Sequence, residues 1–206
     1  MNRSSTIADN LCQITLEQLY ARHTKDINTP LICKKGSGMA TYHRYKPTAN
    51  CHQITYGVKM VYHKLSGYEQ AMIWLTTKEI IKYRFYNGLI TPLNLMSAVI
   101  CHEFSHILQD VQHKRQYNSV HNTDYYRILL NIHKNYGQDV RHALAEISEL
   151  SNKEMQPRPL PTYNKGDLIS FQHKEHAINA TILRINKHTY TVVENNDLDK
   201  QWLIPK

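Results

Sequence analysis

The sequence predicts an α+β protein, in which a mostly helical domain with a small β-hairpin or sheet precedes a small SH3-like β-barrel. Apolar residues recur at three- and four-residue steps in several segments before residue 154, as in amphipathic helices. Three prolines within 157–161 end this pattern, and beyond them the apolar period changes to two, as in strands. We therefore expect a helical domain at 1–154, a proline-rich linker at 155–162 and a β domain at 163–206.

The segment before residue 90 predicts a helix, two strands and a second helix. Leu11, Ile14, Leu16 and Leu19 have helical spacing within 11–22. The elements expected after this helix are strands at 39–45 and 53–57, the second leading into 58–62, a turn at 47–50, and a helix at 68–86 closed by Asn87-Gly88.

The most apolar helix is expected to begin at Thr91-Pro92, because threonine is a good N-cap and proline is favoured at the first helical position. His102 and His106 lie one turn apart on one face of this helix, so both imidazoles can reach one Zn²⁺. Glu103 lies beside them, where it can act as general base on a metal-bound water. The core stripe of the helix lies on a different face and consists of Leu93, Met96, Ile100, Phe104, Ile107 and Val111.

A catalytic zinc needs a third protein ligand. Gln109 and Gln112 stand where the metzincin pattern has glycine and histidine, so that class is excluded. His121 is the preferred third ligand, because the polar loop 114–119 can turn the chain back towards the first two histidines. The alternatives that remain open are His113, Asp124 and a glutamate elsewhere.

A second helix is expected directly after His121, with Asn122 or Thr123 as its cap and Asp124 complementing its dipole. Tyr125 and Tyr126 on this helix could orient a ligand or stabilise an oxyanion. For Tyr125 we favour packing between the helices, and the face of Tyr126 is undecided. A last helix of the domain is expected at 138–153.

The stretch HEFSHILQDVQHKRQYNSVHNTDYYRILLNIH resembles the core of the SprT-like zinc metallopeptidase family. The family pattern is HExxH, a loop, and a third histidine followed four residues later by an aromatic residue, a position that Tyr125 occupies here. The family commonly has glycine after the third histidine, where this chain has Asn122, and many members end in a zinc ribbon that this chain lacks. The resemblance covers roughly residues 12–150 and is firmest over 91–133.

The resemblance implies a zincin-like fold of the minigluzincin type, one Zn²⁺ per chain and hydrolysis of peptide bonds. His102, His106 and His121 would bind the zinc, and Glu103 would be the catalytic base. An edge strand beside the metal-binding helix would hold an extended substrate by backbone pairing.

Short strands are expected beyond the linker, at 167–171, 177–185, 190–194 and 202–205. Four strands in so short a segment predict the SH3-like small barrel. The segment is also similar to a small β module that follows SprT-like domains in some bacterial proteins. Such a barrel could bind nucleic acid or peptide, or could simply cover the catalytic domain.

The formal net charge is +8, and its excess lies in the helical domain, where residues 34–141 contain 14 Lys/Arg against 6 Asp/Glu. Six of these basic residues are interleaved with tyrosines, a pattern that can contact phosphates and stack bases, although a plain basic surface with packed tyrosines explains it equally well. Because SprT-like proteases of eukaryotes digest proteins crosslinked to DNA, the resemblance implies DNA, single-stranded or crosslinked to protein, as a partner. The candidate nucleic-acid-binding residues are Lys34, Lys35, Arg44, Lys46, Lys59 and Lys64.

Cysteine and hydropathy patterns indicate the compartment. The four cysteines are scattered without CxxC spacing, as expected of free thiols under reducing conditions. We find neither a signal peptide nor a transmembrane run, and we expect a cytoplasmic protein with no membrane partner. The remaining histidines lack ligand spacing and are expected on the surface or in packing: His43, His52, His63, His133, His142, His173, His176 and His188.

The sequence therefore predicts a zinc-dependent peptidase, and the resemblance implies that it acts on DNA-associated proteins. One alternative is a non-catalytic nucleic-acid- or protein-binding adaptor on a zincin-like fold, and another is a zinc hydrolase acting on a non-peptide bond. The intact Glu103 argues against the adaptor, because a binding protein has no need of a general base. The sequence predicts neither the substrate nor the oligomeric state.

Overall fold

The computed structural model describes residues 3–116, 118–157, 162–187 and 189–205. The chain divides into an N-terminal unit, Met1–Pro157, and a C-terminal unit, Arg158–Lys206. The first unit contains helices and one sheet, and the second contains another sheet. The chain as a whole is therefore of the predicted α+β class. Of the predicted linker, residues 158–161 lie outside the described residues, as does His188.

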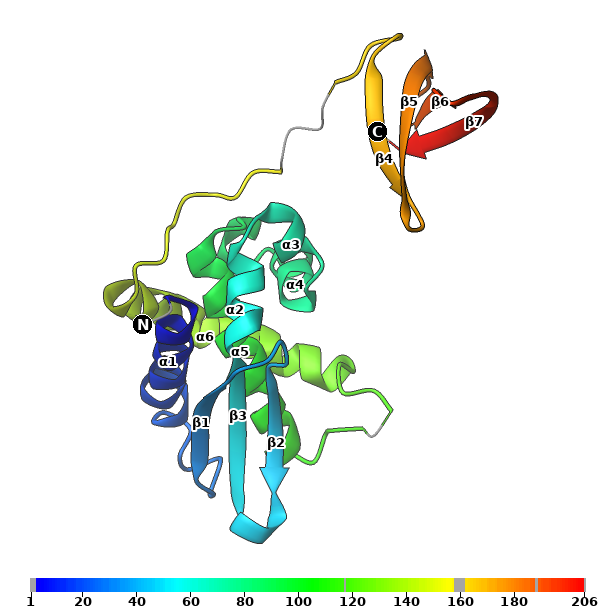
Figure 1. Cartoon of the computed structure of the whole chain (residues 1–206). Coiled ribbons are helices and arrows are strands. Elements are labelled where there is room, and N and C mark those ends of the chain that lie inside the picture. Colours follow the sequence, from blue (N-terminus) through cyan, green and yellow to red (C-terminus); the bar gives the residue numbers. More distant parts are fainter. Residues whose placement is uncertain (1–2, 117, 158–161, 188, 206) are drawn as a thin grey trace. The chain divides into compact units, whose positions relative to one another are not determined.

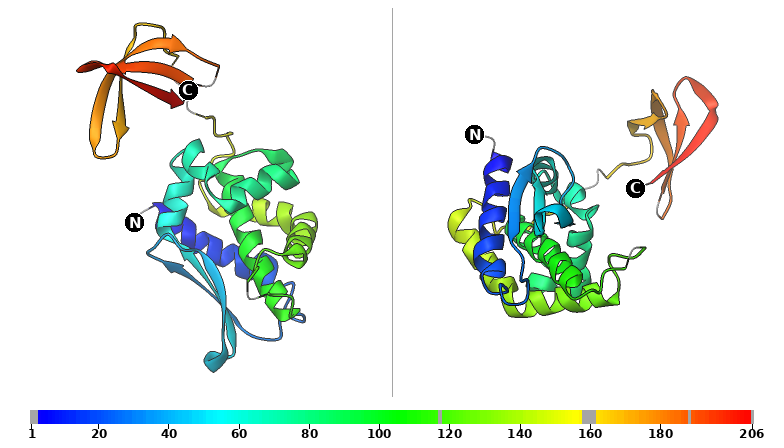
Figure 2. Two further views of the ribbon diagram at one scale, coloured as in Figure 1. Left: turned by 90° about the vertical axis from the view of Figure 1, so that its right-hand side faces the viewer. Right: turned by 90° about the horizontal axis from the view of Figure 1, so that it is seen from below.

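The N-terminal unit begins with a helix and a three-stranded sheet (Figure 1). Helix α1, Arg3–Ile14, continues as a π-helical turn at Thr15–Tyr20. In the sheet, β3 (Cys51–Gly57) lies between β1 (Leu31–Gly36), to which it is parallel, and β2 (Tyr42–Lys46), to which it is antiparallel. Helices α1 and α5 both pack against this sheet (Figure 2). Strand β2 is therefore an edge strand that contacts the helix carrying the HExxH motif.

Two expectations for this region are wrong. The first strand, β1, was not predicted, and the segment expected to continue the second predicted strand to residue 62 is helix α2, Val58–Leu65. The strand ends at Gly57, where a Cβ atom would lie 2.5 Å from the carbonyl oxygen of Gly38, so only glycine allows the loop to approach so closely. Met60, Val61 and Lys64 then follow at helical spacing and are buried.

The helix predicted at 68–86 is interrupted. It consists of α3 (Tyr68–Met72), α4 (Leu75–Tyr83) and a 3₁₀ turn at Phe85–Gly88. Trp74 between α3 and α4 has an extended backbone, and its indole N–H donates a 3.2 Å hydrogen bond to Nδ1 of His63. The chain therefore turns at Trp74, where a tertiary contact forms, although the apolar spacing in the sequence predicts that the helix continues.

Helices α5 (Pro92–Val111) and α6 (Thr123–Ile147) pack against each other across the centre of the unit. The predicted start of α5 is confirmed, because the Thr91 side chain accepts a hydrogen bond from the backbone N–H of Asn94. Helix α6 passes without a break through Gly137 to Ile147, so the separate last helix expected at 138–153 is wrong. Its buried residues before and after Gly137 keep one face, which lets a single helix cover α5.

Helix α5 is the core of the unit. Every residue from Leu93 to Gln109 is buried, including the polar residues of the HExxH motif. A helix that is covered on all sides lies in the centre of a domain. No helix among the described residues is long and apolar enough to cross a membrane.

The C-terminal unit is a four-stranded antiparallel meander in the order β4-β5-β6-β7. Its strands are Leu168–His173, His176–Ile185, Thr189–Glu194 and Asp197–Pro205. They lie close to the four predicted strands, and a small apolar cluster around Ala180, Ile182 and Val192 supports them. Closure into an SH3-like barrel stays a prediction.

Candidate metal centre

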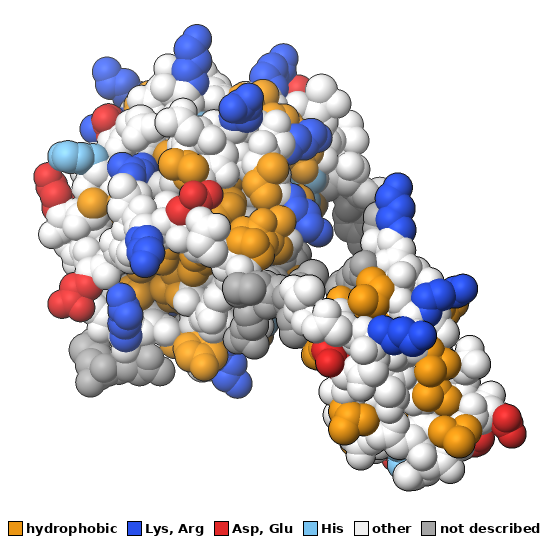
Figure 3. Space-filling view, turned by 90° about the horizontal axis from the view of Figure 1, so that it is seen from above, with side chains coloured by type: hydrophobic (Ala, Val, Ile, Leu, Met, Phe, Trp, Pro, Cys, Tyr) orange, Lys and Arg blue, Asp and Glu red, His pale blue; other side chains and the backbone are white. Residues whose placement is uncertain are grey.

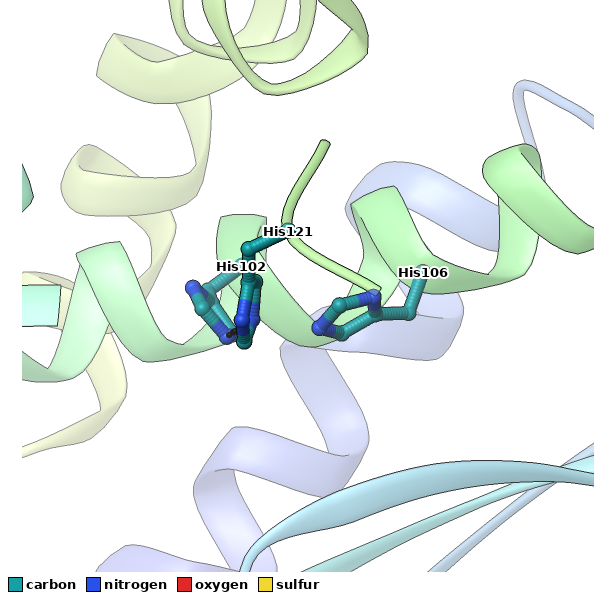
Figure 4. A group of neighbouring side chains, drawn as sticks. All are labelled: His102, His106 and His121. Carbon is teal, nitrogen blue, oxygen red and sulfur yellow. Dashed lines mark hydrogen bonds between the residues drawn. The ribbon is translucent and has the colours of Figure 1, made fainter. Parts of the chain in front are cut away.

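The two histidines of the HExxH motif lie on α5 and point towards His121 (Figure 4). His102 and His106 are 6% and 7% exposed, so their imidazoles lie inside the domain rather than on its surface. Potential ligand atoms of the three residues all lie within 4.8 Å of one another. The structure thus assembles the three histidines that the sequence singled out.

His121 is held in place by the residues on both sides of the loop that precedes it. The side-chain amide of Gln109 on α5 donates to the carbonyl oxygen of Val120 at 2.9 Å and to Oδ1 of Asn122 at 3.2 Å. Asn122 in turn caps α6 by accepting from the N–H of Tyr125. Gln109 therefore ties the loop to the metal-binding helix, a role that the sequence did not predict.

One pair of these nitrogen atoms has the separation expected of two ligands of a tetrahedral metal ion. Nε2 of His121 lies 3.3 Å from Nε2 of His102. Two ligands about 2.0 Å from a tetrahedral zinc are separated by about 3.3 Å. The residues present therefore fit a tetrahedral metal ion held by three histidines.

The Nδ1 atoms of the two helix histidines are engaged by neighbours, which leaves Nε2 of each free to bind a metal ion. Nδ1 of His102 lies 2.9 Å from Oε2 of Glu79 and 2.7 Å from the hydroxyl of Tyr125. Nδ1 of His106 lies 3.4 Å from Oε1 of Gln109. An Nδ1–H donated to these oxygens leaves Nε2 without a proton, and such contacts orient metal-binding histidines and raise their basicity. Glu79 on α4 is a second residue that sequence reasoning missed.

The electrostatic environment keeps the histidines neutral. Burial lowers the pKa of His102 and of His106 to about 3, and burial also lowers the pKa of His121. Neutral imidazole is the form that binds a metal ion. At neutral pH all three side chains are thus ready to act as ligands.

Glu103 faces the same site. The residue is 6% exposed, and its buried Oε2 has no hydrogen-bond partner among the described residues. Burial raises the pKa of Glu103 to about 8, while the charge of Lys64 and a hydrogen bond from the backbone of His43 oppose the rise. A buried carboxylate with an unused oxygen and a pKa near neutrality is suited to accept a proton from a water molecule.

The other candidate residues of the motif region fall outside the histidine group. His113 lies beyond the end of α5 with a left-handed backbone and an exposed side chain, and Asp124 pairs with Arg127. Tyr125 is buried between the helices, and its hydroxyl contacts His102 rather than an open position. Tyr126 is half-buried and packs against Tyr83 and Lys82, which resolves its undecided face.

A second group can also hold a metal ion. His43, His52 and Asp110 offer ligand atoms within 4.8 Å of one another, although no spacing in the sequence joins them. Nε2 of His43 lies 2.9 Å from Nδ1 of His52, a hydrogen-bond distance, and Arg115 lies 3.3 Å from Nδ1 of His43. Arg115 contacts His43 directly and acts on His106 and His121 only through its charge. Because a guanidinium repels a cation, we favour the three-histidine group as the metal centre.

The six basic residues grouped in the sequence separate in the structure. Lys34, Arg44 and Lys46 share the outer face of the sheet, as the register and the alternation along β1 and β2 show. Lys35 points to the other face and pairs with Asp9 at 2.6 Å, and Lys59 is exposed on α2. Lys64 is 1% exposed and cannot contact a nucleic acid backbone. Figure 3 shows Lys and Arg side chains spread over the visible face of the N-terminal unit, with fewer acidic side chains among them.

Comparison of the chain with protein-family models, with curated proteins and with solved structures finds no match. The functional argument therefore rests on the residues and their geometry.

Proposed function

We propose that the protein is a zinc-dependent peptidase of the SprT-like type, with a zincin-like N-terminal domain. The observation that supports this most is the combination of three histidine nitrogens at metal-binding distance with a buried glutamate whose Oε2 is unused. A purely structural zinc site is usually closed by four protein ligands. Here three histidines leave a position for water, and Glu103 stands beside it.

The proposed chemistry divides between metal and chain. Zn²⁺ held by His102, His106 and His121 would polarise a substrate carbonyl and acidify a water molecule. Glu103 accepts the proton of that water and passes it to the leaving amine. Glu79 and Gln109 fix the two helix histidines in the orientation that the reaction needs.

The edge strand β2 supports a peptide as the substrate. Strand β2 packs against α5, and the backbone of His43 on β2 lies close enough to Glu103 to lower the pKa of its carboxyl, so this edge of the sheet adjoins the proposed catalytic residue. An edge strand offers free backbone groups that can pair with an extended peptide. A substrate bound along β2 would present its peptide bonds to the metal centre.

Removal and return of the metal test this proposal. We expect the zinc-loaded protein to hydrolyse an unfolded protein such as denatured casein, to lose this activity in a chelator and to regain it when Zn²⁺ is added back. Fragments are measured by electrophoresis and mass spectrometry. A zinc-loaded protein that cleaves no peptide or protein substrate would instead favour the adaptor, or a hydrolase of a non-peptide bond.

We further propose that the outer face of the sheet contacts single-stranded DNA, since Lys34, Arg44 and Lys46 lie on it together with the exposed ring of Tyr42. Replacing both Arg44 and Lys46 by glutamine is expected to weaken DNA binding and to reduce the slope of log K against log salt by about 1.4, or about 0.7 for each lost phosphate contact. Fluorescence anisotropy at several salt concentrations measures this slope. Arg127→Gln, which changes an exposed arginine on α6, is the control. Equal binding by the wild type, the double variant and this control would refute the contact.

A further inference from the structure

A pocket of about 170 Å³ opens beside the metal centre. His102, Glu103 and His121 are among its lining residues, so a molecule bound to the metal centre can extend into it. The other lining residues are mostly apolar, and the polar ones among them are Thr41, Lys64 and Thr76. The volume corresponds to about five water molecules, or to one amino-acid side chain. The pocket therefore has the position and the size to receive the side chain of a substrate residue next to the cleaved bond.

Lys64 gives this pocket its chemical character. The side chain is 1% exposed, and its ammonium donates one hydrogen bond to Oγ1 of Thr76. The ring of Trp74 lies 5.2 Å from Nζ. In the described part of the chain no carboxylate oxygen lies within 4.0 Å of Nζ, although buried charges in proteins are nearly always paired. Two of the three ammonium donors are thus left for another partner.

The surrounding charges allow that partner to be an anion. Burial lowers the pKa of Lys64 to about 7, while the charges of Glu79 and Glu103 oppose this fall, and Oε2 of Glu79 is engaged with His102. With a divalent cation on the three histidines, Lys64 protonated and both carboxylates ionised, the positive charge exceeds the negative charge by one unit. An anionic side chain in the pocket would balance this charge and satisfy the free ammonium donors.

We propose that this pocket selects peptide substrates with an acidic residue, glutamate or aspartate, beside the cleaved bond, and that Lys64 is the residue that determines this specificity. The inference rests on the proposed peptidase function and names its substrate class. The alternative role for Lys64 is to act through Glu103 by favouring its ionised form. That role would affect all substrates equally, whereas a specificity residue affects acidic substrates alone.

The proposal is tested by measuring cleavage of three quenched fluorescent peptides by the zinc-loaded full chain. The peptides differ only at the position beside the cleaved bond, where they carry Glu, Gln or Leu. We expect kcat/KM of the wild type to be about 10–100-fold higher for Glu than for Gln, the range for a hydrogen bond to a charged group. In Lys64→Met this preference should disappear, so that the ratio of kcat/KM for the Glu peptide to kcat/KM for the Gln peptide falls to about one. Lys59→Met, an exposed lysine on the same helix, is the matched control and should keep the preference.

The outcomes separate the two proposals. Equal or better cleavage of the Gln peptide by the wild type overturns the inference whether or not Lys64→Met folds, and leaves the peptidase standing. If kcat/KM falls equally for all three peptides in folded Lys64→Met, Lys64 acts through Glu103 and does not determine specificity. If zinc-loaded protein cleaves no peptide, the peptidase fails. Anisotropy of labelled Glu and Gln peptides with the Glu103→Gln variant then still measures the pocket, and equal affinities refute it.

Discussion

Replacement of Glu103 by glutamine is expected to lower kcat for peptide hydrolysis by about 10²–10⁴-fold without loss of zinc. Glutamine has nearly the same size and keeps an oxygen acceptor, but its amide cannot take up the proton of a water molecule. The three histidines and the contacts of Glu79 and Gln109 are unchanged by this substitution. The loss should therefore fall on the chemical step and not on the metal.

The measurement is the initial rate of cleavage at saturating substrate, together with zinc content by elemental analysis. Glu146→Gln is the matched control, because Glu146 is an exposed acid on α6 with a side chain 66% exposed. It should cleave as fast as the wild type. If Glu103→Gln is as active as this control, Glu103 is not the base and the proposed mechanism is wrong.

Local signals were sufficient for the elements that carry the metal centre. The N-cap Thr91, the proline after it and the three- and four-residue apolar spacing predict α5, and the structure confirms its start. Asn122 was one of two expected caps of α6 and is the one observed. These predictions succeed because caps and periodicity depend on neighbouring residues, and in this region tertiary contacts agree with them.

Long-range contacts explain what the sequence did not predict. Strand β1 is defined by pairing with β3, whose residues lie 21 positions further along the chain. Trp74 interrupts a helical pattern because its indole bonds to His63 on another helix. Lys64 looks like the other basic residues in the sequence, but the fold buries it beside Glu103. None of these outcomes is contained in local spacing.

The candidate metal centre shows the same division. HExxH and His121 could be predicted because ligand spacing is a local pattern with a known geometry. Glu79 could not, since it reaches His102 from a separate helix. One signal was present in the sequence: Glu79 lies next to Ile80 on the buried face of α4. A buried acidic side chain usually has a polar or charged partner.

Replacement of His121 by alanine is expected to reduce bound zinc from about one ion per chain to a small fraction of that value. Two histidines from one helix hold a zinc ion far less tightly than three ligands, and a metal that binds only the folded chain also stabilises it. The variant should therefore lose activity and should no longer gain in Tm when Zn²⁺ is added. Elemental analysis after dialysis and thermal unfolding with and without Zn²⁺ measure both effects.

Two further histidine variants make this result specific. His113→Ala changes an exposed histidine outside the three-histidine group and should keep the zinc of the wild type. His52→Ala removes a ligand of the second group and should also keep it. Zinc retained by His121→Ala but lost from His52→Ala would move the metal to His43, His52 and Asp110. Glu103 would then not lie beside the metal ion, and this result would refute both the three-histidine site and the proposed peptidase function.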